Sequence, residues 1–411
     1  MTNGRAIGVS AWWRPGGARD PDEVHRASTP LELLFDLCFV VAVSQAAGRL
    51  HVHLADGEVG QGLLGYAMVF FAIWWCWVNT TWYASAYGAE DIPYRLLIML
   101  QICGALVLAA GVPVAFDEHD FSVVTAGYVI MRLALVALWL RAWQGDPDRR
   151  AVTIRFAVGV TLCEVGWVTR LALPAPLLGA SFVVLGLAEV AVPVWAERAG
   201  PPTPWHAEHI AERYGLFTLI VLGESILAAT TAIQEASSTS GVLGSVVMVA
   251  GGGLLIVFSL WWSYFDRPAH SGLRASRRST RASLLPFAWG YGHYVVFACV
   301  AALGAGLQVV AERAAHAGEG VERLHDVPTA LTVAVPVAGY LVVMGLLHTA
   351  LDAADPALVV FGGGAVLMLA AATIAAVLPL PATVLVLGLA AAVVVAVDAY
   401  RRAGRGYDPA S

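Results

Sequence analysis

The sequence predicts an all-α protein, a polytopic transmembrane helix bundle with about 12 spans. Of its 411 residues, 58% are hydrophobic and only 13% are charged, and the mean hydropathy is +0.70. Water-soluble domains do not have this composition. The apolar residues also gather in runs of about 20 or more, long enough as helices to cross roughly 30 Å of hydrocarbon. A third observation is the division of arginine between alternate loops, which fits an even number of crossings.

The apolar runs are separated by polar or Pro/Gly-rich stretches, which fixes the order of the helices. The first span follows Thr29-Pro-Leu-Glu32, a capping box with proline at the first helical position. Pro-x-Pro sequences at 174–176 and 379–381 predict tight hairpins between the spans that flank them. The Arg/Ser-rich connection 266–284 is expected to be a loop. The expected spans are residues 31–50, 61–83, 94–115, 122–143, 152–173, 177–196, 211–233, 242–265, 285–311, 329–350, 356–378 and 381–400.

Arginine supplies all 24 basic residues, because the chain has no lysine. If the N-terminus is cytoplasmic, 19 arginines fall inside and Arg132 lies within the fourth span. Only four arginines then fall outside, at Arg49, Arg170, Arg313 and Arg323. Since basic residues concentrate in cytoplasmic loops, we expect both ends of the chain inside the cell. No signal peptide is expected, because no short apolar core with a cleavage site precedes the first span.

The two halves of the sequence resemble each other weakly. Residues 39–47 and 72–79 match residues 218–226 and 259–266, which brings Gln45 opposite Glu224 in the alignment. Two six-span halves have the same orientation, so we expect a parallel 6+6 pseudo-repeat. The predicted organisation is a cytoplasmic N-terminal segment at 1–28, a first six-helix half at 29–198, a second at 199–405 and a tail at 406–411.

Glu224 is the strongest candidate functional residue, because it is the only charged residue in the run from Tyr214 to Thr231. A carboxylate removed from water costs several kcal/mol unless it is neutralised, paired or hydrated. An ionisable side chain inside a membrane is therefore a functional hypothesis by default. The alternative is a protonated Glu224 that only bonds a neighbouring helix.

Asp36 is a second candidate, one turn deeper than Glu32 and on the same helix face. Inside the membrane it needs water or a cation, and we expect an Arg or His from the second half to supply the cation. Glu32 completes the capping box, which alone can explain its presence, and the alternative is that it belongs to an ion or substrate pathway with Asp36.

The seventh span begins with a polar segment that contains His209, Glu212 and Arg213. Arg213 and Glu224 are eleven residues apart, close to three helical turns, so both project from one side of the helix. His209 and Glu212 lack the spacing typical of a metal pair, so we expect a polar helix entrance and no metal. His293, flanked by glycine and aromatic residues, is a further buried candidate.

Tryptophans cluster at 74–77 and 261–262, at the cytoplasmic ends of even-numbered spans. Interfacial aromatic belts are found at such positions, so we expect belts here and no cofactor cage. The triple glycine at 251–253 is compatible with an unwound helix segment or with close helix packing.

The absence of lysine excludes a P-loop lysine, a Schiff base with pyridoxal phosphate or retinal, and a lysine nucleophile. No connection is long enough for a nucleotide-binding domain, so we expect no cofactor and no nucleic-acid binding. The expected partners are the lipid bilayer and a small-molecule or ion substrate. The sequence leaves the substrate and the oligomeric state open.

Three stretches carry a resemblance to a known family. Residues 28–40, the tryptophan run with Trp82-Tyr83, and residues 209–225 resemble the bacterial low temperature requirement A (LtrA) family. The likeness covers nearly the whole chain. It implies a multi-pass inner-membrane protein linked to growth in the cold, and it names a phenotype without a reaction. It also marks five motif positions without assigning them roles. They are Glu32, Asp36, Glu212, Arg213 and Glu224.

Three functions fit these observations. The favoured one is a secondary transporter in which Glu224, with Asp36 and His293, takes up a proton or cation. The second is an intramembrane enzyme that acts on lipid through an acid and a base. The third is a non-catalytic membrane component for cold or stress adaptation, in which buried charges only hold helices together.

Overall fold

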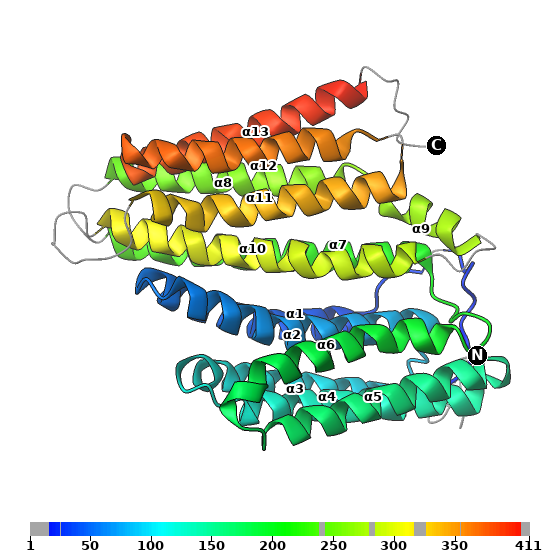
Figure 1. The fold of residues 1–411 in the computed structure, drawn as a ribbon. Coiled ribbons are helices and arrows are strands. Elements are labelled where there is room, and N and C mark those ends of the chain that lie inside the picture. Colours follow the sequence, from blue (N-terminus) through cyan, green and yellow to red (C-terminus); the bar gives the residue numbers. More distant parts are fainter. Residues whose placement is uncertain are drawn as a thin grey trace, which may run out of the picture. The chain divides into compact units, whose positions relative to one another are not determined.

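The computed structural model describes residues 16–24, 26–237, 243–278, 284–315, 326–353 and 355–403. In this part of the chain, 12 helices are long and apolar enough to cross a membrane, which confirms the predicted all-α fold and the number of spans (Figure 1). Most of the N-terminal segment, residues 1–15, and the predicted tail 406–411 lie outside the described residues.

Each predicted span corresponds to one helix. Helix α7 continues through Gly223 without a break. The connection 266–284 was expected to be a loop, which is wrong for ten residues that form the short amphipathic helix α9, with Leu273 buried. The helices are α1 (Pro30–Ala55), α2 (Val59–Tyr87), α3 (Ile92–Asp117), α4 (Ser122–Gly145), α5 (Arg150–Arg170), α6 (Ala175–Glu197), α7 (Ala207–Ser237), α8 (Leu243–Phe265), α9 (Ala269–Arg278), α10 (Leu285–Ala315), α11 (Asp326–Leu351), α12 (Ala357–Ala372) and α13 (Leu380–Ala403).

The chain forms two compact units, and their boundaries fall within α1, α2 and α7. The first unit contains residues 1–42 and 71–213, and the second contains residues 43–70 and 214–411. The six-helix halves at 29–198 and 199–405, and the parallel repeat that relates them, stay a prediction.

In the first unit, successive helices from α3 to α6 pack against each other, and tight turns join them. Gly127 of α4 allows close approach to α3, since a Cβ there would lie 2.4 Å from the Leu108 nitrogen. Helix α6 buries only Glu189, Val192 and Ala196. Its remaining apolar side chains are available to contact lipid.

In the second unit, α10, α11 and α12 pack in succession, and α8 packs against α13. Gly252 of α8 faces Gly388 of α13, where a Cβ on Gly388 would lie 2.5 Å from the Gly252 carbonyl oxygen. Helix α8 is continuous across the triple glycine. Close helix packing therefore accounts for Gly252, and no unwound segment is present at 251–253.

Candidate functional site: a carboxylate–arginine cluster at the starts of α1 and α7

The first turn of α1 positions Glu32. The Thr29 backbone N–H donates to Glu32 Oε2 at 2.8 Å, and the Glu32 N–H donates to Thr29 Oγ1 at 3.3 Å. Helix α1 begins at Pro30. These contacts confirm the predicted capping box, which fixes the Glu32 side chain at the end of the helix.

One turn further along α1, Asp36 forms a bidentate ion pair with Arg213 of α7. Arg213 Nη2 lies 2.5 Å from Asp36 Oδ1, and Arg213 Nε lies 3.2 Å from Oδ2. Asp36 is 0% exposed and Arg213 is 1% exposed. The predicted cation partner of Asp36 from the second half of the sequence is thus confirmed as Arg213. Paired N–H donors on one carboxylate give both strength and a fixed geometry.

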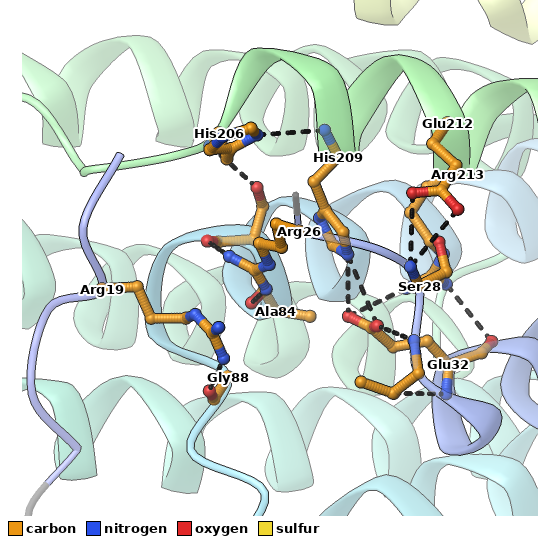
Figure 2. Close-up of polar contacts among 12 residues, drawn as sticks. Arg19, Arg26, Ser28, Glu32, Ala84, Gly88, His206, His209, Glu212 and Arg213 are labelled. Carbon is orange, nitrogen blue, oxygen red and sulfur yellow. Dashed lines mark hydrogen bonds and ion pairs between the residues drawn. The ribbon is translucent and has the colours of Figure 1, made fainter. Parts of the chain in front are cut away.

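Glu32 is the second carboxylate at the same arginine. Arg213 Nη1 lies 3.3 Å from Glu32 Oε1, and His209 Nε2 lies 3.3 Å from the same oxygen. Figure 2 shows His209 and Arg213 reaching from α7 toward Glu32. His209 is fully buried, and its Nδ1 has no hydrogen-bond partner among the described residues. We call Glu32, Asp36, His209 and Arg213 the α1–α7 cluster.

Hydrogen bonds to α7 and α2 fix the position of residues 26–28, which lead into α1. The Ser28 backbone N–H donates to both Glu212 carboxylate oxygens, at 3.3 and 3.2 Å (Figure 2). Arg26 donates to the carbonyl oxygens of Ala84 and Ser85 in the last turn of α2. Basic side chains commonly satisfy the last carbonyls of a helix in this way. Burial, with a contribution from nearby Arg19, lowers the pKa of Arg26 to about 10.

A pocket lies beside Glu32 and contains about 270 Å³ of space, part of it open to solvent. Its walls come from the N-terminal segment, the first turn of α1, the connection between α2 and α3, and the start of α3. The lining residues are Arg19, Arg26, Ala27, Thr29, Glu32, Gly88, Glu90 and Tyr94. The cluster is therefore approached by a polar surface.

The residues that build this cluster lie inside the region that matches a known family. Residues 27–398 match the family described as bacterial low temperature requirement A protein (LtrA). The chain belongs to the LtrA family. The LtrA match covers nearly the whole chain, so all 12 candidate spans fall in it or overlap it.

One curated relative of this LtrA chain is an uncharacterized protein of Rhizobium meliloti (strain 1021). It is 29% identical over 289 residues, which is 65% of this chain and 65% of the relative. The matched region thus spans just under two thirds of the relative's length. No solved structure matches the chain.

The tryptophans of α2 were expected in an interfacial belt, and for Trp75 and Trp77 this prediction is wrong. Both are 0% exposed. Trp77 Nε1 donates to Asp36 Oδ1 at 2.7 Å, and Trp75 Nε1 donates to Glu189 Oε2 at 2.9 Å. A buried indole N–H needs an acceptor, and here each acceptor is a buried carboxylate. Trp261 and Trp262 are exposed, at 43% and 49%, as a belt requires.

The remaining candidates of the LtrA chain lie in the second unit. Glu224 is half-buried, and Ser44 Oγ donates to its Oε1 at 2.5 Å. No basic side chain among the described residues pairs with Glu224. Gln45, which aligned with Glu224 in the predicted repeat, is exposed, and its neighbour Ser44 makes the contact.

His293 is fully buried with both ring nitrogens occupied. Its Nδ1 lies 2.8 Å from the Trp289 carbonyl oxygen and must donate to it, so Nε2 accepts from the Tyr264 hydroxyl at 3.0 Å. The Tyr214 ring also packs against it. These contacts are those of a satisfied core histidine.

Proposed function

We propose that this LtrA protein is a secondary transporter whose cycle is coupled to a proton or another cation taken up by Glu224. The observation that carries the proposal is the difference between Asp36 and Glu224. Both carboxylates lie in helices long enough to span a membrane. Asp36 has a buried cation partner, whereas a single hydroxyl is the partner of Glu224 in the described residues.

A carboxylate without a counter-ion inside a bilayer is stable only if it binds a proton or a cation, or reaches water. Glu224 is half-buried, and we propose that a water-filled path reaches it in at least one state of the protein. Such a group changes charge as the ion arrives and leaves. This property is what ion-coupled transport requires of one of its side chains.

The α1–α7 cluster has a different place in this proposal. The Asp36–Arg213 pair holds the starts of α1 and α7 together at a fixed separation. Glu32 is the second carboxylate of the cluster, and it lies 3.3 Å from both Arg213 Nη1 and His209 Nε2. We propose that the cluster fixes the helix ends beside the pocket and that Glu224 exchanges the coupling ion.

We further propose that the N- and C-termini are cytoplasmic and that each half contributes six spans. The arginine distribution supports this orientation. In this arrangement α1 and α7 both begin on the cytoplasmic side, so the pocket beside Glu32 opens to the cell interior. Single cysteines placed in a cysteine-free background at the exposed positions Glu118 and Asp148 test the orientation. Only the first should react with an impermeant reagent from outside, and the reverse pattern would contradict the orientation.

The transport proposal is tested with purified protein in liposomes that contain a pH-sensitive dye. Amino acids, sugars, carboxylates and monovalent cations are added singly to the outside in the presence of a pH gradient. At least one solute should move protons in liposomes with protein and not in empty ones. If none does, while the protein keeps its helical circular dichroism spectrum and a cooperative melting transition, coupling to protons is contradicted.

A non-catalytic role is the second candidate, and the Asp36–Arg213 pair favours it. A buried, fully bonded ion pair needs no transported ion to explain its presence. In that case Glu224→Gln would leave growth in the cold and membrane abundance unchanged. A transporter would lose activity with abundance intact, so the two measurements together separate the hypotheses.

A further inference from the structure

The first unit contains another buried group of charges, which shares no residue with the proposed transport site. It consists of Arg132 from α4, Glu164 from α5 and Glu189 from α6, and we call it the α4–α6 cluster. The three residues are 1%, 5% and 0% exposed. All three residues lie within helices that are candidate spans.

Glu189 is bonded as an ionised carboxylate would be. Arg132 Nη2 lies 2.5 Å from Oε2, and Trp75 Nε1 donates to the same oxygen at 2.9 Å. The Tyr128 hydroxyl and Trp167 Nε1 donate to Oε1 at 2.9 and 3.3 Å. Four donors converge on two oxygens, and an ionised carboxylate accepts that many. Glu189 is also the one charged residue that α6 buries.

Glu164 has the opposite surroundings. Arg132 Nε approaches its Oε1 to 3.3 Å, but outside hydrogen-bond geometry. Neither Glu164 oxygen accepts a hydrogen bond from any described residue, and Arg132 Nε and Nη1 also have no partner there. One arginine therefore faces two carboxylates, and its only hydrogen bond in the described part of the chain goes to Glu189.

The charge balance follows from the groups around Glu164. Besides Arg132 and Glu189, the ionisable side chains that interact electrostatically with Glu164 in the described part of the chain come from α2, α4 and α5. They are Cys76, Tyr128 and Cys163. Thiols and phenols are neutral at ordinary pH, so none of them supplies a second positive charge. With both carboxylates ionised, the buried cluster would have a net charge of −1 and one carboxylate without donors.

A buried carboxylate that accepts no hydrogen bond costs far more free energy than a neutral carboxylic acid in the same place. We infer that the α4–α6 cluster binds one proton, carried by Glu164. The cluster is then neutral, with Glu189 as the counter-ion of Arg132. This is a proton-binding site made of residues that the proposed transport mechanism does not use. It exists whether or not the protein transports a solute.

Infrared spectroscopy of the purified protein tests the inference, because carboxylic acids and carboxylates absorb at separate frequencies. The spectrum of Glu164→Gln subtracted from that of the wild type should show the loss of a carboxylic acid band. That band should shift in D₂O. The exposed Glu118→Gln variant is the control and should lose a carboxylate band instead. Loss of a carboxylate band from Glu164→Gln would overturn the inference, because Glu164 would then be an ionised partner of Arg132.

Thermal stability gives a second, independent readout on the same protein. Glu164→Gln replaces a neutral acid by a neutral amide of similar shape, so its melting temperature should match that of the wild type. Glu189→Gln removes the counter-ion of Arg132 and should lower the melting temperature clearly. In that variant Glu164 should become ionised as the new counter-ion, and its acid band should disappear. If Glu164→Gln fails to fold, or melts as low as Glu189→Gln, the inference is wrong.

Discussion

The α1–α7 cluster and the α4–α6 cluster contain similar charges in different surroundings. Each has one buried arginine, two carboxylates and an indole N–H from α2. In the first, both carboxylates are bonded, because Thr29, His209 and Arg213 all reach Glu32. In the second, four donors bond Glu189, and no described residue donates a hydrogen bond to Glu164. The number of donors around each carboxylate, rather than the number of charges, distinguishes the two clusters.

This difference indicates different responses to mutation. Breaking a buried ion pair leaves an uncompensated charge, whereas replacing a neutral group by another neutral group costs little. Arginine variants should therefore have large effects in both clusters. Carboxylate variants should cost more stability where the carboxylate is ionised than where it is protonated.

The largest effect should come from removing the arginines. Arg213→Gln leaves Asp36 with Trp77 as its strongest donor, and we expect a loss of about 3–5 kcal/mol. Arg132→Gln should cost less, because Glu189 keeps Tyr128 and two indole donors. Melting temperatures in detergent measure both, with the exposed Arg198→Gln as the control. An Arg213→Gln variant as stable as Arg198→Gln would show that the Asp36 pair does not hold α1 and α7 together.

A smaller effect is expected from the indole donors. Trp77→Phe removes one of three donor groups on Asp36, and hydrogen bonds to charged groups contribute about 1.5–3 kcal/mol. Trp75→Phe removes one of four donors on Glu189 and should cost less. The change in side-chain volume is the same, so each variant is the matched control of the other. Equal losses of stability would mean that cavity formation, and not the hydrogen bond, determines the effect.

Replacing the second carboxylate of each cluster, Glu32 or Glu164, should have a smaller effect on stability. Glu32→Gln keeps a capping side chain but removes the charge that faces His209 and Arg213, so we expect a cost of about 1 kcal/mol. The free energy of unfolding of Glu164→Gln should lie within a few tenths of a kcal/mol of the wild-type value. Surroundings that donate no hydrogen bond favour a neutral side chain. Denaturation followed by tryptophan fluorescence compares the two. A reversed order would exchange the protonation states that we assign to the two clusters.

The smallest effect should come from an ion pair outside the spans. Arg19 bonds Glu23 at 2.8 Å and lowers the pKa of that carboxyl below its ordinary value of 4.5. A lowered carboxyl pKa stabilises the folded state above pH 4.5, and this contribution is lost as the pH falls through the folded pKa. Partly exposed pairs contribute at most about 1 kcal/mol. Glu23→Gln should therefore flatten the acid limb of the stability curve slightly, and an unchanged curve would show that the pair contributes nothing.

The sequence predicted the fold well, because membrane helices follow from apolar length alone. It also predicted the capping box and a cation for Asp36, since both follow from local rules of helix ends and of buried charge. It did not predict the role of Trp75 and Trp77. Tryptophan near the end of a span is typical of a belt, and only the packing of α2 against other helices shows that these rings face inward.

The α4–α6 cluster is a second feature that the sequence did not predict. Arg132, Glu164 and Glu189 are ionisable residues within apolar runs of the sequence. Their partnership depends on which faces of α4, α5 and α6 meet, and spans with charge-poor sequences give little periodic signal for that. The sequence offered one clue to this partnership, which is the number of charged residues within spans that follow one another along the chain.

The central claim is that Glu224 exchanges the coupling ion during transport. The most direct measurement is proton movement in liposomes that contain the wild type, Glu224→Gln or the control Glu118→Gln, at equal amounts of folded protein. Glutamine keeps the shape of Glu224 and its ability to accept from Ser44, but it cannot release a proton. We predict normal flux for the wild type and for Glu118→Gln, and loss of solute-dependent proton flux for Glu224→Gln with an unchanged melting temperature. Full proton flux through Glu224→Gln would contradict the claim.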